Sequence, residues 1–229
     1  MTAQKPVRRT QAERSAAMRT RILEATIRSL HVNGYAATTT LLVAKEAKVT
    51  RGAMLHHFAT KVDLMLFVVQ AVYEEELELY RKYLVEVADL EQRRLMLPKM
   101  IWDVLSRPSG VAVLEILQGS RSDAVLAKRL GPLQAKIERD SIQRIEKYDM
   151  LASPQPHLAM VRLLVWAVRG LSIANVLVRK PSEIGESVEL LSEMLAHYYV
   201  GTGVMTAPQK KGSKRAASGR SDVKKGRHQ

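Results

Sequence analysis

The 229-residue sequence predicts an all-α protein, and three observations support this fold class. Apolar residues recur at three- and four-residue spacing, and no stretch sustains the alternation of apolar and polar residues that half-buried strands require. Aromatic residues make up 5% of the chain, and 12 Gly and 8 Pro are few for the turns of a many-stranded β architecture. An apolar fraction of 46% is ordinary for a globular protein and excludes wholesale disorder.

Helix start and stop signals are clearest in the first quarter of the chain. A helix is predicted over about 19–32, and Asn33 and Gly34 end it because glycine tolerates positive φ. Three further helices, over 40–47, 51–58 and 61–87, each follow a threonine whose hydroxyl group can accept a free backbone amide: Thr39, Thr50 and Thr60.

The remaining helices are expected near 90–105, 111–119, 123–147, 157–178 and 183–200. Gly131-Pro132 is expected to bend or break the third of these, because proline lacks an amide donor and clashes with the preceding turn. Residues 158–178 approach the length of a membrane span, but Arg162 and Arg169 lie inside, so a soluble helix buried on both sides is the better interpretation. The first 18 residues lack the apolar core of a secretory signal, which predicts a cytoplasmic protein.

Positive charge is concentrated at the two ends of the chain. The formal net charge of +13 divides into +8 for residues 1–61, −2 for 62–205 and +7 for 206–229. Such basic segments suit an anionic polymer as partner. Residues 206–229 are expected to be disordered, and they are either a solvated extension or a second, non-specific contact to nucleic-acid phosphates.

Residues 39–58 have the pattern of a helix-turn-helix unit, in which two short helices are joined by a tight turn. On the second helix, Met54 and Phe58 are four residues apart and should share the inward face. The residues turned outward, where a helix in the major groove would meet base edges, are Arg51, Gly52, Leu55 and His56. Adjacent helical residues point about 100° apart, so His56 and His57 are not expected to form a metal pair.

Residues 19–67 resemble, without gaps, the DNA-binding domain of the TetR family of transcriptional regulators. Four segments carry the match: Arg21–Ala25, Gly34–Thr39, Ala44–Ala53 and His56–Lys61. The family layout implies a basic flexible arm over 1–18, a helix-turn-helix DNA-binding domain over 19–61, a helical ligand-binding and dimerisation domain over 62–205 and a basic tail over 206–229.

The resemblance also implies roles for particular positions. Thr39, Thr40 and Lys61 correspond to family positions that contact phosphate, and helix N-termini favour anions in any case. Thr50 and the outward face of the third helix correspond to positions that enter the major groove. The predicted DNA-binding residues are therefore Thr39, Thr40, Thr50, Arg51, Gly52, Leu55, His56 and Lys61.

Three residues depart from the family pattern. Leu41 stands where many members carry arginine or another polar residue, and Leu55 replaces the usual tyrosine. Lys48 replaces the usual glycine of the turn, so the turn forms either without positive φ or with some strain. For Leu55 two interpretations stay open: an apolar contact to a thymine methyl group, or a residue that the interface merely tolerates.

The family layout implies dimerisation through the last two helices, and two apolar stripes suit a four-helix bundle between subunits. They consist of Leu164, Val168, Leu171 and Asn175 on one helix and Val188, Leu191, Leu195 and Tyr199 on the other. Candidate ligand contacts combine apolar walls with a few polar groups, although ordinary packing or interface is the preferred interpretation of each: Trp102, Gln118, Trp166 and Arg169. Arg162 and Trp166 are spaced for a cation–π pair.

No catalytic, metal or cofactor site is predicted. The sequence has no cysteine, which excludes disulfides, thiolate metal sites and thiol nucleophiles. It also has no GxxxxGK[ST], GxSxG or HExxH motif, so enzyme activity is not expected. The run Glu74-Glu75-Glu76 is expected to lie on a solvated helix face.

Together these patterns predict a cytoplasmic transcriptional regulator with double-stranded DNA, a second copy of itself and a small-molecule effector as partners. The preferred hypothesis is a repressor that binds a palindromic operator as a homodimer and is released by an inducer. The alternative is a ligand-independent DNA-organising or adaptor protein that uses the same DNA-binding head.

Overall fold

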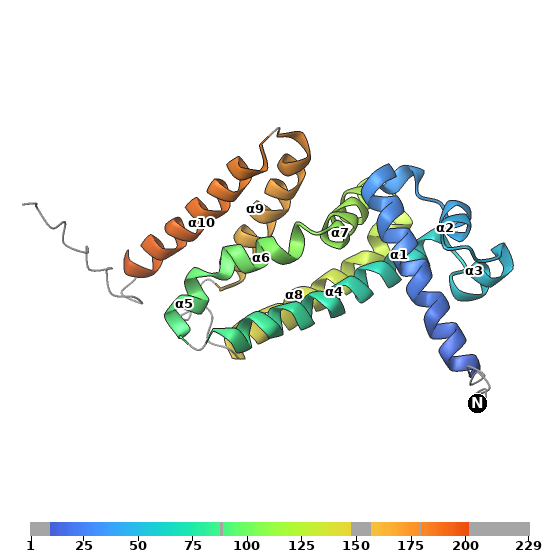
Figure 1. The fold of residues 1–229 in the computed structure, drawn as a ribbon, viewed down its shortest axis with the longest axis horizontal. Helices are drawn as coiled ribbons and strands as arrows, with labels where there is room; N and C mark the ends of the chain where they lie inside the picture. The colour runs from blue at the N-terminus through green and yellow to red at the C-terminus, as the bar shows by residue number, and fades with distance from the viewer. Residues whose placement is uncertain (1–9, 88, 148–156, 179, 202–229) are drawn as a thin grey trace, which may run out of the picture.

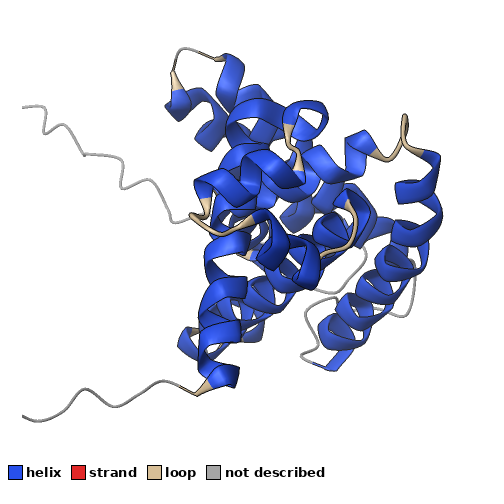
Figure 2. Ribbon diagram, turned by 90° about the vertical axis from the view of Figure 1, so that its right-hand side faces the viewer, coloured by secondary structure: helices blue, strands red, loops and turns tan. Residues whose placement is uncertain are grey.

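The computed structural model describes residues 10–87, 89–147, 157–178 and 180–201, and within these ranges the chain forms ten helices and no strand (Figures 1 and 2). The predicted all-α fold is confirmed. The three N-terminal helices lie at one end of the molecule and the two C-terminal helices toward the other, with α4 and α8 side by side between them (Figure 1). The predicted tail over 206–229 lies outside the described residues.

The helices fall into two groups, which we call the head and the body. The head consists of α1 (Gln11–Ala37), α2 (Thr40–Glu46) and α3 (Arg51–His57). The body consists of α4 (Lys61–Glu86), α5 (Leu90–Leu95), α6 (Leu97–Leu105), α7 (Pro108–Gly119), α8 (Ala124–Lys147), α9 (His157–Leu177) and α10 (Pro181–Gly201).

The threonine caps predicted from the sequence are present. The hydroxyl oxygens of Thr39, Thr50 and Thr60 each accept the backbone amide three residues further on, at 3.1 Å. Each bond satisfies one of the amides that the first turn of a helix leaves unpaired, which is why α2, α3 and α4 begin where they do.

The first helix begins earlier than predicted, so part of the segment assigned to a flexible arm is helical. Thr10 and Glu13 form a capping box, in which each side chain accepts the other residue's backbone amide, and α1 starts at Gln11. Further along α1, the Arg19 guanidinium lies over the ring of Phe67, 4.4 Å from its centroid. This contact joins the N-terminal half of α1 to α4.

Gly34 interrupts α1 at the predicted end of the helix. Its φ of +75° lies in the left-handed region, and the chain resumes helical geometry only for the last residues up to Ala37. A Cβ atom at this position would lie 3.1 Å from Oε2 of Glu115 on α7. Glycine therefore supplies both the backbone angle and the space for α7 to approach.

The predicted helices over 90–105 and 123–147 each contain a proline, Pro98 and Pro132. Residues 90–105 form two helices, α5 and α6, because the chain breaks at Met96 and Pro98 lies in the first turn of α6, where its missing amide is harmless. Pro132 does not end α8, which runs through it from Ala124 to Lys147. Gly131 and Pro132 are exposed, so water can bond to the carbonyl that the proline leaves without a donor.

The larger of two cores, here called the head core, joins the head to part of the body. Its residues come from α1–α4 with α7 and α8: Ile22, Ala25, Leu30, Val43, Ala44, Ala47, Met54, Phe58, Val62, Leu64, Met65, Val68, Val69, Val72, Ala112, Val113, Ile116, Leu126 and Leu130. The domain boundary expected at residue 61 coincides with the start of α4. The core of the DNA-binding head nevertheless continues beyond this residue, because side chains of α7 and α8 complete it.

The second core, here called the body core, lies among the C-terminal half of α4, α6, α9 and α10. Its residues are Leu84, Leu97, Met100, Ile101, Val104, Leu105, Val161, Leu164, Val168, Leu195 and Tyr199. α4 contributes to both cores, so it connects them as a single rigid element.

The close crossing of α1 and α7 forms the main junction between head and body. A Cβ atom at Gly119 would lie 2.3 Å from the ring of Tyr35, so only glycine permits this approach. The Tyr35 backbone amide donates to Glu115 at 3.1 Å, and its hydroxyl group donates to Asp123 at 2.7 Å. Across the α4–α8 contact, Arg129 and Asp63 form an ion pair at 2.6 Å.

One helical stretch, Ala159–Leu177 in α9, is long and apolar enough to cross a membrane, with a mean hydropathy of 1.5. This is weak support for a membrane span, because core helices of soluble proteins share that composition. One face of α9 is buried through Leu164, Val168 and Arg169, but other apolar side chains are exposed. The burial on both sides expected from the sequence is therefore not reached within a single subunit.

Candidate DNA-binding face and sensor cavities

The helix-turn-helix unit is formed by α2, α3 and the turn between them. Met54 and Phe58 are buried at 1% and 3% exposure, which confirms that they share the inward face of the second helix. Val43, Ala44 and Ala47 pack from α2 and the turn into the same head core. Their small side chains let the two short helices cross closely.

The turn keeps the left-handed geometry of a glycine although it carries a lysine. Lys48 has φ +53°, the one non-glycine residue with positive φ in the described part of the chain. Of the two outcomes expected for this position, the strained one is therefore observed. A side chain in this conformation costs on the order of 1 kcal/mol.

Most of the predicted DNA-binding side chains lie on an exposed surface. Thr39, Thr50, Arg51, Gly52, Leu55 and His56 are exposed, whereas Thr40 and Lys61 are half-buried. A Cβ atom at Gly52 would meet no atom within 4 Å, so packing inside the chain does not require this glycine. Leu55 is 45% exposed, and Leu41 on α2 is 66% exposed. Exposed leucines beside an arginine suit a surface that a partner covers.

Lys61 makes contacts within the protein in addition to the phosphate contact predicted for it. Its ammonium group donates to the carbonyl oxygen of Tyr35 at 2.6 Å and lies 3.9 Å from the centroid of the Tyr35 ring. Burial lowers the pKa of Lys61, and the carboxylate of Asp123 opposes this effect. Lys61 thus joins the end of α1 to the start of α4, a role that no sequence motif indicated.

The two neighbouring histidines have different surroundings. His56 is exposed on the outer face of α3 and lines a groove with Arg14 and Gln11 of α1. The His57 ring lies 6.2 Å from the ring of Phe58, and burial lowers its pKa, with the nearby charges of His56 and Arg19 adding to the effect. His57 packs against the head, as expected.

Comparisons with known proteins show which protein family has a DNA-binding head of this kind. Residues 22–68 match the family model described as bacterial regulatory proteins of the tetR family. An uncharacterised HTH-type transcriptional regulator of Mycobacterium tuberculosis is 29% identical over 136 residues, which cover 56% of this chain and 68% of that protein. CymR of Pseudomonas putida, also an HTH-type transcriptional regulator, is 38% identical over 82 residues, covering 36% and 40%. The DNA-binding head of the chain belongs to the TetR family.

Solved structures of TetR-family and related proteins share the fold of most of the chain. Salmonella enterica GusR has a TM-score of 0.59 at 18% identity, covering 84% of this chain and 96% of GusR. A TetR transcription regulator from Haloarcula marismortui has a TM-score of 0.59 at 19% identity, covering 80% and 98%. This TetR-family protein is thus a DNA-binding transcriptional regulator with a helical body attached to its head.

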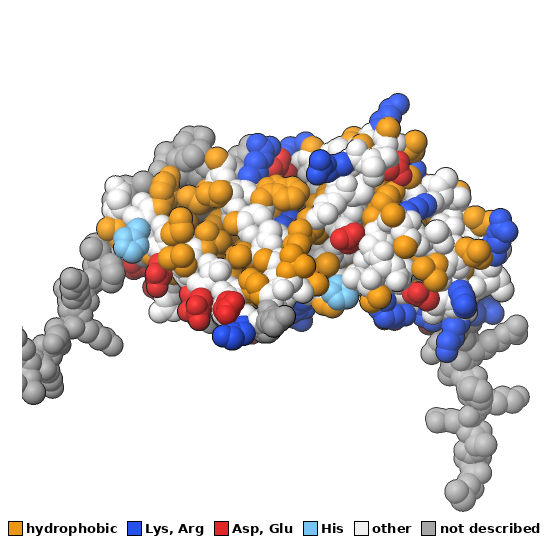
Figure 3. Space-filling model, turned by 90° about the horizontal axis from the view of Figure 1, so that it is seen from above, with side chains coloured by type: hydrophobic (Ala, Val, Ile, Leu, Met, Phe, Trp, Pro, Cys, Tyr) orange, Lys and Arg blue, Asp and Glu red, His pale blue; other side chains and the backbone are white. Residues whose placement is uncertain are grey.

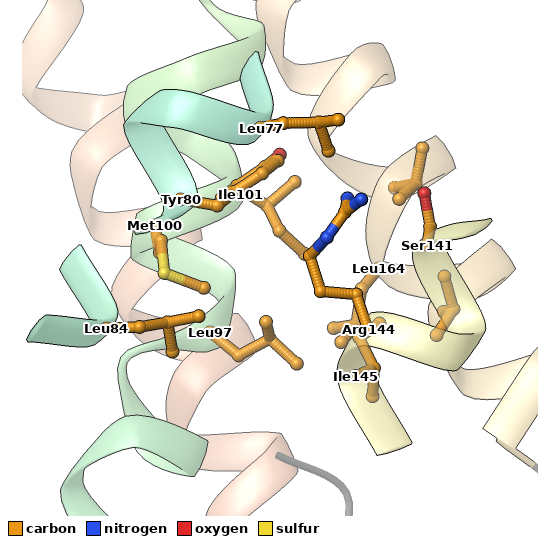
Figure 4. Close-up of a pocket in the computed structure, with 12 residues that line it drawn as sticks. Leu77, Tyr80, Leu84, Leu97, Met100, Ile101, Ser141, Arg144, Ile145 and Leu164 are labelled. Carbon is orange, nitrogen blue, oxygen red and sulfur yellow. The ribbon is translucent and has the colours of Figure 1, made fainter. Parts of the chain in front are cut away.

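The body of this TetR-family regulator contains two adjoining cavities. The first lies among α4, α6, α8 and α9 and has mostly apolar walls, as Figure 4 shows: Leu77, Tyr80, Leu84, Leu97, Met100, Ile101, Ser141, Arg144, Ile145, Val161, Leu164 and Val165. In Figure 4 the side chain of Arg144 extends from α8 into the space between the helices. Its guanidinium donates to the Tyr73 hydroxyl group at 3.5 Å.

The second cavity lies among α7, α8 and α9 and includes two of the four predicted ligand contacts. Trp166 and Arg169 line it, whereas Trp102 and Gln118 line neither of these two cavities. Trp102 packs against the body core and Gln118 is exposed. The cation–π pair expected between Arg162 and Trp166 is not the observed one: Arg162 pairs with Glu138, and Arg169 lies 5.8 Å from the Trp166 ring centroid.

At the cavities, Glu76 and Tyr80 on α4 and Arg169 on α9 form a polar cluster, in which Arg169 is buried and the other two are half-buried. Glu74 and Glu75 are exposed as expected, but Oε1 of Glu76 is buried and has no hydrogen-bond partner among the described residues. Burial raises the pKa of Glu76 to about 7, although the positive charge of Arg169 opposes the shift. Burial also raises the pKa of Tyr80, one turn along α4, and lowers that of Arg169. The prediction that Glu76 lies on a solvated helix face together with Glu74 and Glu75 is therefore corrected.

The apolar stripes predicted to join two subunits pack largely inside one subunit. Five of the eight residues are at most 4% exposed in the single chain: Leu164, Val168, Val188, Leu195 and Tyr199. Leu171, Asn175 and Leu191 are half-buried. The prediction is corrected here, because α9 and α10 turn these side chains toward α6 and toward each other.

A different set of apolar side chains is exposed on the same two helices, and we call it the α9–α10 apolar face. It consists of Leu163, Trp166, Ile173, Val176, Leu177, Leu190, Met194 and Tyr198, all between 41% and 78% exposed. Figure 3 looks onto this side of the molecule and shows apolar side chains gathered over α9 and α10. Periodicity alone did not indicate which apolar stripe would face inward.

Proposed function

We propose that this TetR-family regulator is a repressor that binds a two-fold symmetric operator as a homodimer and is released by a small molecule. The observation that carries the proposal is the exposed outer face of α3 on a head whose core is completed by α7 and α8. Because the DNA-binding head shares a core with α7 and α8, a conformational change in the body can alter the position of α3.

In the proposed complex, the outer face of α3 enters the major groove. Arg51 reads a base edge, and Thr39, Thr50 and His56 contact the DNA from exposed positions. Thr40 and Lys61 lie at the edge of this surface. We expect Arg51→Ala to weaken binding to the operator by about 10- to 100-fold, the usual cost of losing one base contact. Lys128→Ala, on the exposed surface of α8, is the matched control.

The proposed dimer is formed through the α9–α10 apolar face. Exposed apolar side chains on neighbouring helices suit a four-helix bundle between two subunits, which would place two copies of α3 about one DNA turn apart. Val176→Asp, at 71% exposure on this face, is expected to give monomers in sedimentation and to abolish tight operator binding. Val125→Asp, at 63% exposure on α8, should leave the dimer intact.

In the proposed switch, a ligand between α4, α8 and α9 shifts α4 and α8 against α7 and thereby moves the head. The contacts available for transmission are Tyr35 with Glu115 and Asp123, and Asp63 with Arg129. A ligand shifts the equilibrium only by its difference in affinity for the two arrangements. The coupling can therefore be measured as the change in operator affinity at saturating ligand.

Footprinting on DNA that the protein enriches from a random-sequence pool tests the proposed function. Protection of a short inverted repeat supports the repressor. Broad protection without a repeat supports the alternative of a DNA-organising or adaptor protein, which the basic charge of residues 206–229 favours. Deleting 206–229 should reduce the salt dependence of binding and keep the sequence preference, whereas a loss of preference would contradict this division of roles.

A further inference from the structure

The two cavities of the body share a wall and can hold one elongated ligand. Ser141, Val161 and Val165 line both cavities. The space not filled by atoms is about 600 Å³ in the first and about 890 Å³ in the second, part of it open to solvent. Without the part open to solvent, the cavity volume is about 90 Å³ in the first and about 330 Å³ in the second, so only the second reaches by itself the range of small-molecule sites, about 300–1,000 Å³. The first cavity is mostly apolar, and the second has the charged side chains of α8 and α9.

The charges that line the two cavities are predominantly positive. Arg162 and Glu138 neutralise each other in a bidentate pair, with nitrogen–oxygen distances of 2.5 and 2.9 Å. The other charged side chains on the two walls are Arg144 and Arg169. A ligand in these cavities therefore meets a net positive charge, which favours an anion over a cation.

Among the charged residues that line the cavities, Arg169 has a buried hydrogen-bond donor without an acceptor among the described residues. It is 9% exposed, and its Nη1 atom has no hydrogen-bond partner among the described residues. An unsatisfied buried donor destabilises the folded state, and a charged one does so more strongly. Glu76 is the carboxylate with the strongest electrostatic effect on Arg169, but it lines neither cavity. Because the pKa of Glu76 is raised to about 7, this carboxyl group is partly protonated near neutral pH and neutralises Arg169 incompletely.

We propose that the effector is an organic carboxylate whose anionic group binds the Arg169 guanidinium and whose apolar body extends into the first cavity. The inference rests on the proposed function, because it names the chemical class of the inducer. The forked donors of a guanidinium match the two oxygens of a carboxylate. A neutral amide can accept a hydrogen bond from Nη1 of Arg169 but brings no opposite charge, and a cationic ligand would face two arginines.

The test measures binding of matched probes to the full chain by titration calorimetry at pH 7.5. Decanoate and 4-phenylbutyrate are the carboxylates, decanamide and 4-phenylbutyramide are their neutral counterparts, and decylamine is the cation. We expect each carboxylate to bind at least tenfold more tightly than its amide, and decylamine to bind most weakly. Arg169→Gln should remove this tenfold preference and leave amide binding unchanged, which also verifies that the variant is folded. Arg169→Lys should restore part of the preference.

Two controls make the result specific. Arg139→Gln removes one exposed positive charge from α8 outside both cavities and should leave every affinity within twofold. Arg144→Gln tests the other arginine: if it removed the carboxylate preference and Arg169→Gln did not, the assignment to Arg169 would be overturned. Equal binding of carboxylates and amides, or binding of neither, would also overturn the proposal.

The effector class and the proposed switch can fail separately. Carboxylates that bind through Arg169 without changing operator affinity would support the ligand assignment and contradict inducible release. Release of the operator by decylamine or by the amides, with no carboxylate preference, would support inducible release and overturn the carboxylate assignment.

Discussion

The head core and the body core are built from similar residues but differ in how completely they are filled. In the head core, Ile22, Leu64 and Ile116 are fully buried, and the α1–α7 crossing is so close that one position must be glycine. The body core lies beside two cavities and next to Glu76 and Arg169, which have buried polar atoms without partners. The same helical pattern thus yields a tightly packed region and a loosely packed one.

This difference in packing suits the two regions to different functions, transmission of movement in the head core and ligand binding in the body. A close-packed core transmits displacement because its side chains cannot be rearranged cheaply, so the head is expected to move when α4 and α8 shift against α7. A region with cavities, and with buried polar atoms that have no hydrogen-bond partner among the described residues, has interactions still to make, and a ligand can supply them. Substitutions in both cores and at their junction test this difference in packing. They follow in order of decreasing expected effect.

The largest effect is expected from truncating the head core. Ile116→Ala should lower the free energy of unfolding by about 3–5 kcal/mol, because α7 and the head close tightly around this fully buried side chain. Leu164→Ala, equally buried but on the wall of the first cavity, should cost less, about 2–3 kcal/mol, since part of its surroundings is already empty. Urea denaturation measures both values. Equal costs would contradict the difference in packing.

The next effect concerns the buried carboxyl group of the body. The pKa of Glu76 is raised from its usual 4.5 to about 7, so the folded chain holds this proton to higher pH than the unfolded chain does. Its contribution to stability is therefore fully present below pH 4.5 and is lost as the pH rises through about 7. Integrated over this range, the loss is at most about 3 kcal/mol.

Replacing the carboxyl group isolates this contribution. Glu76→Gln should leave stability nearly unchanged at pH 5 and raise it at pH 8, relative to the unmodified chain. Glu75→Gln, at the exposed neighbouring position, should behave alike at both pH values. Thermal denaturation followed by circular dichroism gives the comparison, and parallel pH profiles for all three proteins would show that Glu76 does not titrate in a buried environment.

A third effect probes the junction between the cores. Gly119→Ala places a methyl group 2.3 Å from the Tyr35 ring, so α1 and α7 must separate, at a cost of about 1–3 kcal/mol. Gly131→Ala, where a Cβ atom meets nothing within 4 Å, should instead stabilise α8 by about 0.5–1 kcal/mol. Operator binding should weaken for the first variant only. A Gly119→Ala protein with unchanged stability would show that the crossing is not close-packed.

The sequence was most informative where the signal is local. Helix starts could be predicted from Thr39, Thr50 and Thr60, since a cap depends only on the next three residues. The inward direction of Met54 and Phe58 followed from four-residue spacing on one short helix. The proposed DNA-binding face can therefore be outlined from the sequence. The extra helical turns before Arg19 form because Thr10 and Glu13 cap the helix earlier than its apolar spacing indicates.

Features that depend on contacts between distant segments could not be predicted. α9 and α10 carry apolar residues on more than one face, and only the position of α6 determines that Leu164 is buried while Val176 is exposed. The bond from Lys61 to the carbonyl oxygen of Tyr35 spans 26 residues, and the burial of Glu76 depends on α9. Such features follow from packing geometry, which periodicity does not encode.

The smallest expected effect lies in the head itself, at the strained turn of the helix-turn-helix unit. Lys48→Gly should raise stability by about 1 kcal/mol, because φ +53° is costly for a side chain and free for glycine, less the entropy that glycine loses on folding. Lys45→Gly, inside α2 and equally exposed, should lower stability by a similar amount. If Lys48→Gly also leaves operator affinity unchanged, the strain is a tolerated departure within an otherwise well-packed head. Weaker operator binding with higher stability would instead show that the Lys48 side chain contributes to DNA contact.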